Sequence, residues 1–185
     1  RQRQMCIRDR DYINNKKGVD SVLNARVKEC APFENVYTLA LRGLHDRAMN
    51  ASNDMGDRKD MLQEALMAQR QMLIDAIGKP GEEIPQAFTP YKEVLDVYDE
   101  GLELPDDVTI IWPDDNYGYM KRLSSPKEQK RSGRSGVYYH SSYLGKPHDH
   151  LWMNTISPTL MYEELRKAYD ATADRIWLLN ACLLY

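Results

Sequence analysis

The sequence lacks an apolar run near the roughly 20 residues that a membrane-spanning helix needs, and its N-terminus has no apolar stretch of a secretory signal. It also lacks a strong charge of either sign. Its 25 basic and 28 acidic residues leave a formal net charge of −3, without the basic excess that is typical of nucleic-acid-binding domains. We therefore expect neither a membrane nor a nucleic acid as partner. The 185 residues, 42% of them hydrophobic, suffice to bury a core.

Cysteine is scarce. Cys6, Cys30 and Cys182 lie far apart without metal-ligand spacing, and their odd number argues against a closed disulfide framework. Two of them fall in the ends of the chain, "RQRQMCIRDR" (1–10) and "ACLLY" (181–185), which resemble translated sequencing-adapter sequence. We expect residues 11–180 to be an internal fragment of a longer protein, so the cysteine argument carries little weight.

The apolar pattern alternates between strand-like and helix-like stretches. Helices are predicted over 58–78 and 89–101 and from the pair Ser157-Pro158 onward, where serine caps and proline opens the first turn. Strands are predicted over 34–43, 107–112, 136–144, 150–156 and 174–180. The basic, Ser- and Gly-rich stretch 124–136 is interpreted as a solvated connection. Strands that alternate with helices favour an α/β fold with a parallel sheet.

Polar side chains cluster at three of the predicted strands. Because functional residues of such folds gather at the carboxyl ends of the strands, these groups predict a site there. The three groups are Arg42, His45 and Asp46; Asp114, Asp115 and Asn116; and Tyr138, His140 and Tyr143.

These residue types suit a carbohydrate that carries a negative group. An arginine offers a planar fork for a carboxylate, aromatic rings can stack on sugars, and two carboxyl groups can cleave a glycosidic bond. The candidate acids and bases are Asp46, Glu93, Asp114 and Asp115, and the candidate stacking residues are Trp112, Tyr117, Tyr138, Tyr143 and Trp152.

Two other kinds of catalytic chemistry have weaker support in the sequence. No G-x-S-x-G motif is present, which disfavours a serine nucleophile of that kind. His148 and His150 could meet one metal ion in an extended segment, although a third ligand would have to come from elsewhere. We expect no metal and no cofactor, and keep a metal-dependent hydrolase as an alternative.

Three stretches, "YTLALRGLHDRAM" (37–49), the long segment 90–152 from "PYKEVLDVYDEG" to "KPHDHLW", and "SPTLMYEELRKAYD" (157–170), resemble glycoside hydrolase family 115. The resemblance implies a xylan α-1,2-glucuronidase that removes (4-O-methyl)glucuronic acid from glucuronoxylan or its oligosaccharides. It implies a secreted or periplasmic multidomain enzyme with an inverting mechanism, and the parent protein is a candidate homodimer. It also implies a (β/α)8 barrel, of which 185 residues hold only part, since a whole barrel takes about 250.

The resemblance also assigns roles to residues. Glu93 and Asp46 match the catalytic carboxylates, and which is acid and which is base stays open. Arg42 matches a residue that contacts the uronate. The residues that would line the sugar pocket are Asn116, Tyr138, His140 and Tyr143. Ala40, Leu144 and His150 depart from the family pattern at the rim. A non-catalytic carbohydrate-binding barrel of the same descent is the second alternative.

Overall fold

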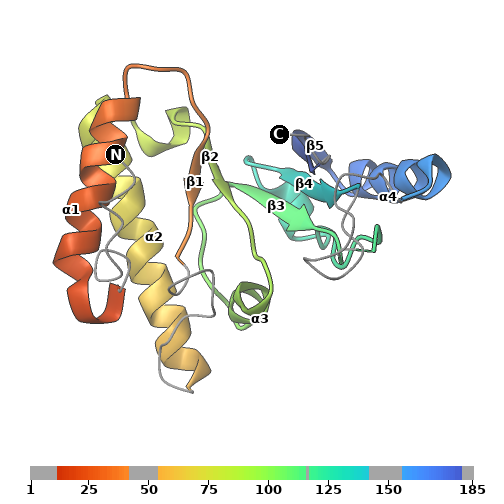
Figure 1. The fold of residues 1–185 in the computed structure, drawn as a ribbon, viewed down its shortest axis with the longest axis horizontal. Helices are drawn as coiled ribbons and strands as arrows, with labels where there is room; N and C mark the ends of the chain where they lie inside the picture. The colour runs from red at the N-terminus through yellow and green to blue at the C-terminus, as the bar shows by residue number, and fades with distance from the viewer. Residues whose placement is uncertain (1–11, 42–53, 116, 142–155, 181–185) are drawn as a thin grey trace. The chain divides into compact units, whose positions relative to one another are not determined.

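A computed structural model describes residues 12–41, 54–115, 117–141 and 156–180 (Figure 1). The chain divides into two compact units. The first comprises Arg1–Gln86 with Lys92–Leu104, and the second comprises Ala87–Tyr91 with Pro105–Tyr185. Each unit is described by itself.

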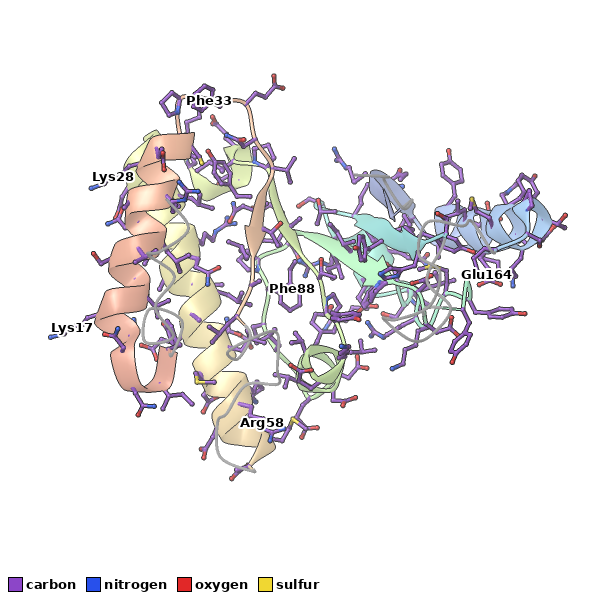
Figure 2. All side chains as sticks on the ribbon, viewed as in Figure 1. Lys17, Lys28, Phe33, Arg58, Phe88 and Glu164 are labelled. Atoms are coloured by element: carbon purple, nitrogen blue, oxygen red, sulfur yellow. The ribbon has the colours of Figure 1, made fainter. Side chains whose placement is uncertain are left out.

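The first unit contains two long helices that lie side by side, α1 (Tyr12–Cys30) and α2 (Met55–Ile77) (Figure 1). Tyr12, Val19 and Ala65 are buried where the two helices meet. The sequence pattern did not predict α1. Most of its surface is polar, Lys17 and Lys28 point away from the protein (Figure 2), and only Tyr12 and Val19 are buried along its length, so the apolar stripe is too sparse to stand out.

The predicted helix 58–78 is confirmed as α2, which begins three residues earlier. Asp54 explains the earlier start, because its carboxylate accepts a hydrogen bond from the Gly56 N–H at 2.9 Å and caps the helix. Gly78 ends the helix in the left-handed region at φ 73°, and its N–H donates to the Ile74 carbonyl.

The rest of the first unit is built from short elements. Strand β1 (Tyr37–Leu39) lies within the predicted strand 34–43, and helix α3 (Glu93–Asp99) is shorter than the predicted 89–101. A turn of 3-10 helix, η4 (Gly81–Glu83), precedes strand β2 (Gln86–Phe88), which the sequence did not predict. The last two residues of β2 belong to the second unit. Three residues near two prolines show too little alternation to be recognised as a strand.

The second unit is built on parallel strands β3 (Thr109–Pro113), β4 (Ser135–His140) and β5 (Ala173–Asn180). Register pairs such as Trp112 with Val137 and Tyr138 with Leu178 align them. The predicted α/β class is therefore confirmed, and successive parallel strands are what a part of a (β/α)8 barrel provides. All five residues of β3 are buried, as expected for a parallel strand covered on both faces. Within this unit the strands follow the order β2–β3–β4–β5, and Ala87 of β2 pairs with Thr109 of β3.

Helix α4 (Pro158–Asp170) begins where it was predicted, because the Ser157 hydroxyl accepts a hydrogen bond from the Leu160 N–H at 3.2 Å. The core beside it consists of Val137, Tyr139, Ile156, Ala168 and Ala173. The predicted strands 107–112, 136–144 and 174–180 are present with shifted bounds, and 150–156 lies outside the described residues except at Ile156.

The interpretation of 124–136 as a solvated connection was wrong in part. Ser124 is buried and its hydroxyl bonds that of Ser135 at 3.0 Å. The Arg131 guanidinium donates to the carbonyls of Pro105 and Val108. A 3-10 turn, η5 (Glu128–Lys130), lies between these anchors. The stretch is therefore tied to the start of β3.

Candidate functional site

The carboxyl ends of β3 and β4 bring Asp114 and His140 together. The Asp114 Oδ1 lies 2.5 Å from the His140 Nδ1, and the two side chains are 0% and 7% exposed. A buried charged group is retained in proteins only where it is paired or well hydrogen-bonded. Asp114 meets this condition through His140, whose position in the sheet is fixed by the register of β4.

The Asp114 carboxylate also completes the sheet. The Asp114 N–H donates to the Tyr138 carbonyl at 3.1 Å, which is the last ladder bond of β3 toward β4. In a parallel ladder that continued, the next donor, the His140 N–H, would reach the Asp114 backbone carbonyl. It donates to the Asp114 Oδ2 instead, at 3.1 Å. One carboxylate therefore holds both the main chain and the imidazole of His140.

The imidazole plane is fixed from a second side. The rings of Tyr138 and His140 meet edge to face, with centroids 4.6 Å apart and an interplanar angle of 77°, a favoured geometry for aromatic pairs. An ionised carboxylate can only accept, so a ring nitrogen that is hydrogen-bonded to one carries the proton. Nε2 is then an acceptor in the neutral ring and a donor in the imidazolium.

Asp115 makes different contacts, with the backbone of the turn that follows β3. Its Oδ1 accepts the backbone N–H groups of Tyr117 at 2.8 Å and Tyr119 at 3.1 Å, and its own N–H donates to the Tyr119 carbonyl. It thereby shapes the turn after β3, as aspartates commonly do. The turn presents Tyr117 and Tyr119, which are 55% and 53% exposed.

The part of this turn that contains Gly118 and Met120 is anchored to the core by hydrogen bonds. Glu164 on α4, labelled in Figure 2, is buried and accepts the Met120 N–H at 2.8 Å. The Tyr139 hydroxyl donates to the Gly118 carbonyl at 2.8 Å. Gly118 has φ 91°, and a Cβ there would lie 2.9 Å from that hydroxyl, so only glycine suits the position. The described residues 117–120 of this turn are therefore held at three points.

The sequence did not single out Tyr139 or Glu164. Glu164 did leave a signal, because it falls four residues after Leu160 and four before Ala168, on the apolar face of α4. A carboxylate on a face that packs against the core requires a buried donor. The Met120 N–H provides it, and the exposed Lys167 ammonium makes a further contact with Glu164 Oε1 at 2.5 Å.

Tyr139→Phe tests the anchor at Gly118. Burial, helped by the charges of Asp114 and Glu164, raises the pKa of Tyr139 to about 12. A raised folded-state pKa means that the neutral phenol stabilises the fold below the unfolded value near 10, and that this stabilisation is lost as pH rises toward 12. At neutral pH we expect the variant to lose about 1 kcal/mol.

The measurement compares the wild-type and Tyr139→Phe forms of the full-length protein by urea unfolding from about pH 8 to about pH 12. The stability difference between the two proteins should shrink over the upper part of this range. A difference that stays constant with pH would contradict the assigned role of the phenol.

Glu93 is the first residue of α3 and is half-buried. The residue before it, Lys92, has φ 51° and ψ −122°, a region that strongly favours glycine. Such strain costs about 1–3 kcal/mol and persists where the surrounding structure imposes it. Glu93 lies in the first unit and His140 in the second, so each is described in its own unit.

Of the other predicted site residues, Tyr138 and His140 are brought together at the end of β4, as described above. Trp112 is wrong as a stacking residue, because it is fully buried in the core. Arg42, His45, Asp46, Asn116, Tyr143, His148, His150 and Trp152 lie outside the described residues.

Among the described residues, no group of three His, Cys, Asp or Glu side chains is placed to hold a metal ion. No helix within the described ranges is long and apolar enough to cross a membrane. Asp114 and His140 pair with each other, and an imidazole held in place by a carboxylate is a group that can bind and orient polar ligands.

Comparison with known proteins adds to this geometry. A sequence model of Glycosyl hydrolase family 115 matches residues 2–183. Among solved structures, the chain resembles BtGH115A, described as a novel family GH115 4-O-methyl-α-glucuronidase with specificity for decorated arabinogalactans. The two are 45% identical, with a TM-score of 0.87 over 92% of this chain and 22% of that chain, so this chain spans about a fifth of the length of that enzyme. No curated protein matched.

Proposed function

The chain belongs to glycoside hydrolase family 115, and we propose that it forms part of the catalytic (β/α)8 barrel of a longer α-glucuronidase, here called the parent enzyme. The parent enzyme removes α-1,2-linked (4-O-methyl)glucuronic acid from glucuronoxylan. The observation that supports this most is the 45% identity to a solved 4-O-methyl-α-glucuronidase over 92% of the chain. We propose a secreted or periplasmic enzyme.

The proposed reaction inverts the anomeric centre. Arg42 holds the uronate carboxylate, one of Glu93 and Asp46 protonates the leaving xylose oxygen, and the other activates water on the opposite face. Such enzymes separate the two carboxyl groups by about 6.5–9.5 Å to leave room for that water.

The remaining pocket residues orient the sugar. Asn116, Tyr138, His140 and Tyr143 contact its hydroxyls. We propose that residues 117–120, which Asp115, Tyr139 and Glu164 hold in place, help to present the preceding Asn116. Rigid presentation matters because rate falls steeply when a binding group is misplaced by about 1 Å.

A second substrate deserves a parallel test, because the solved relative is described as specific for decorated arabinogalactans. The uronate would occupy the same pocket in both cases. The polysaccharide backbone would meet the rim, where the exposed Tyr117 and Tyr119 lie on the turn after β3. Replacing Tyr117 and Tyr119 would then change which polysaccharide the enzyme prefers and would leave uronate binding unchanged.

The test uses the parent enzyme, recovered as a full-length gene. It is incubated with glucuronoxylan and, separately, with glucuronate-decorated arabinogalactan, and the released sugar is followed by proton NMR from the first minutes. β-Uronic acid appearing before mutarotation supports an inverting glucuronidase, and α-anomer indicates retention. Binding without release would favour the non-catalytic carbohydrate-binding alternative.

The 185-residue chain alone is a useful control. A part of a barrel leaves strand edges unpaired, so we expect the isolated chain to release no sugar and to aggregate or remain partly unfolded. A soluble monomer with a sharp cooperative melt would contradict that expectation.

A further inference from the structure

We infer that Asp114 is a positioning residue, which fixes the tautomer and the orientation of the His140 imidazole for substrate binding. The inference rests on the proposed function, in which His140 contacts the sugar. It starts from two contacts of one carboxylate, Oδ1 to the His140 Nδ1 at 2.5 Å and Oδ2 from the His140 N–H at 3.1 Å.

The two contacts together leave the imidazole little freedom. The backbone contact sets where β4 ends, and the Nδ1 contact sets the rotation of the ring relative to that backbone. The Tyr138 ring, edge to face at 4.6 Å, restricts the remaining tilt. A carboxylate that is 0% exposed has no water to replace these partners, so its orientation follows from the protein alone.

The chemical consequence concerns Nε2. With Nδ1–H directed at Asp114, Nε2 accepts a hydrogen bond from a sugar hydroxyl when the ring is neutral, or donates to the uronate when it is charged. The opposite neutral tautomer, with the proton on Nε2, could donate a hydrogen bond but could not accept one from the sugar hydroxyl. Asp114 therefore determines whether the neutral His140 ring accepts or donates a hydrogen bond at Nε2, without contacting the substrate itself.

Asp114→Asn is the substitution that isolates this effect. The amide has almost the same shape, and its oxygen can keep the bond from the His140 N–H that completes the ladder. Its NH2 group then faces Nδ1 and donates to it, which forces the proton onto Nε2. The fold is kept and the tautomer is reversed, as in catalytic triads where an amide replaces the aspartate.

The experiment is a double-mutant cycle on kcat/KM in the parent enzyme, with Asp114→Asn, His140→Gln and both together. We expect Asp114→Asn to lower kcat/KM roughly 10- to 100-fold. In the His140→Gln background the same change should cost less than about 3-fold, because the group on which it acts is gone. Asp170→Asn on the exposed face of α4 makes the same chemical change and should leave activity unaltered.

If Asp114 had a purely structural role, the fold-losses in kcat/KM of the two single variants would multiply in the double variant. This result would overturn the inference. Thermal unfolding of each variant identifies a loss of fold. A second measurement needs no activity: 15N NMR of histidine-labelled parent enzyme, with the His140 signals identified by their absence in His140→Gln. Protonated Nδ1 in the wild type and protonated Nε2 in Asp114→Asn are expected, and protonated Nε2 in the wild type would overturn the inference.

The two measurements separate this inference from the proposed function. If the wild type releases no uronic acid from any uronate-bearing polysaccharide, the proposed function fails and the NMR result alone decides the tautomer. If the wild type is active and Asp114→Asn is equally active, the inference fails and the function stands.

Discussion

Replacing Glu93 by glutamine in the parent enzyme is expected to lower kcat by about 10²–10⁴-fold, the range that a general acid or base supplies. The amide has nearly the same size as the carboxyl group but can neither deliver nor remove a proton at the required rate. KM should change far less, because the sugar contacts are assigned to other residues.

The backbone around Glu93 supports this expectation. Lys92 adopts φ 51° and ψ −122°, an unfavourable conformation for a residue with a Cβ, directly before the glutamate. Its side chain makes no helix cap, so capping does not explain the strain. Strained residues collect at sites where a side chain must be aimed, and the half-buried Glu93 is the next residue along the chain.

The control variant is Glu100→Gln, at the exposed C-terminal end of the same helix, which should retain wild-type turnover. An aryl uronide with a good leaving group sharpens the assay, because its departure needs no proton. If Glu93 is the acid, the variant loses much less activity on this substrate than on glucuronoxylan. If Glu93 is the base, both losses are similar. Near-wild-type turnover on both substrates would remove Glu93 from the mechanism.

Sequence reasoning succeeded where a local signal was strong. α2 has a wide apolar face with a glycine stop, and α4 has a serine cap followed by proline, so both were predicted. It failed for α1, which packs through few residues, and for β2, which is three residues long. The existence of these two elements depends on tertiary contacts, which no window of sequence contains.

The candidate site was also predicted in part and missed in part. The position of His140 in a strand of the sheet, among polar groups at a carboxyl end, was predicted, because parallel strands collect such groups there. That Asp114 pairs with it, whereas the adjacent Asp115 caps a turn, was not predicted. The difference depends on the register between β3 and β4, which places one carboxylate against His140 and the other against the backbone of its own turn.

Trp112→Ala is expected to destabilise the second unit by about 3–5 kcal/mol, the usual cost of emptying a large aromatic site in a core. Trp112 is 0% exposed, and its Nε1 donates to the Ser124 hydroxyl at 2.8 Å. The Arg122 guanidinium lies over its ring, 4.4 Å from the centroid, a geometry that adds a cation–π attraction. The alanine would remove all three interactions at once.

Trp112→Phe separates the contributions, because it keeps most of the apolar volume and removes the N–H. We expect it to cost about 1–2 kcal/mol, chiefly from the lost bond to Ser124 and from imperfect packing. The comparison therefore tests whether the tryptophan stabilises the fold through its volume or through its polar atom.

Hydrogen–deuterium exchange in the parent enzyme measures the effect locally, in peptides that cover β3 and β4. Faster exchange there in Trp112→Ala, with a smaller change in Trp112→Phe, is the result expected of a core residue. A stacking residue would behave differently, raising KM for the polysaccharide while exchange stayed at wild-type rates. Because Trp112 has no exposed surface, a sugar could reach it only if β3 left the sheet, so the exchange experiment also tests the register that brings Asp114 to His140.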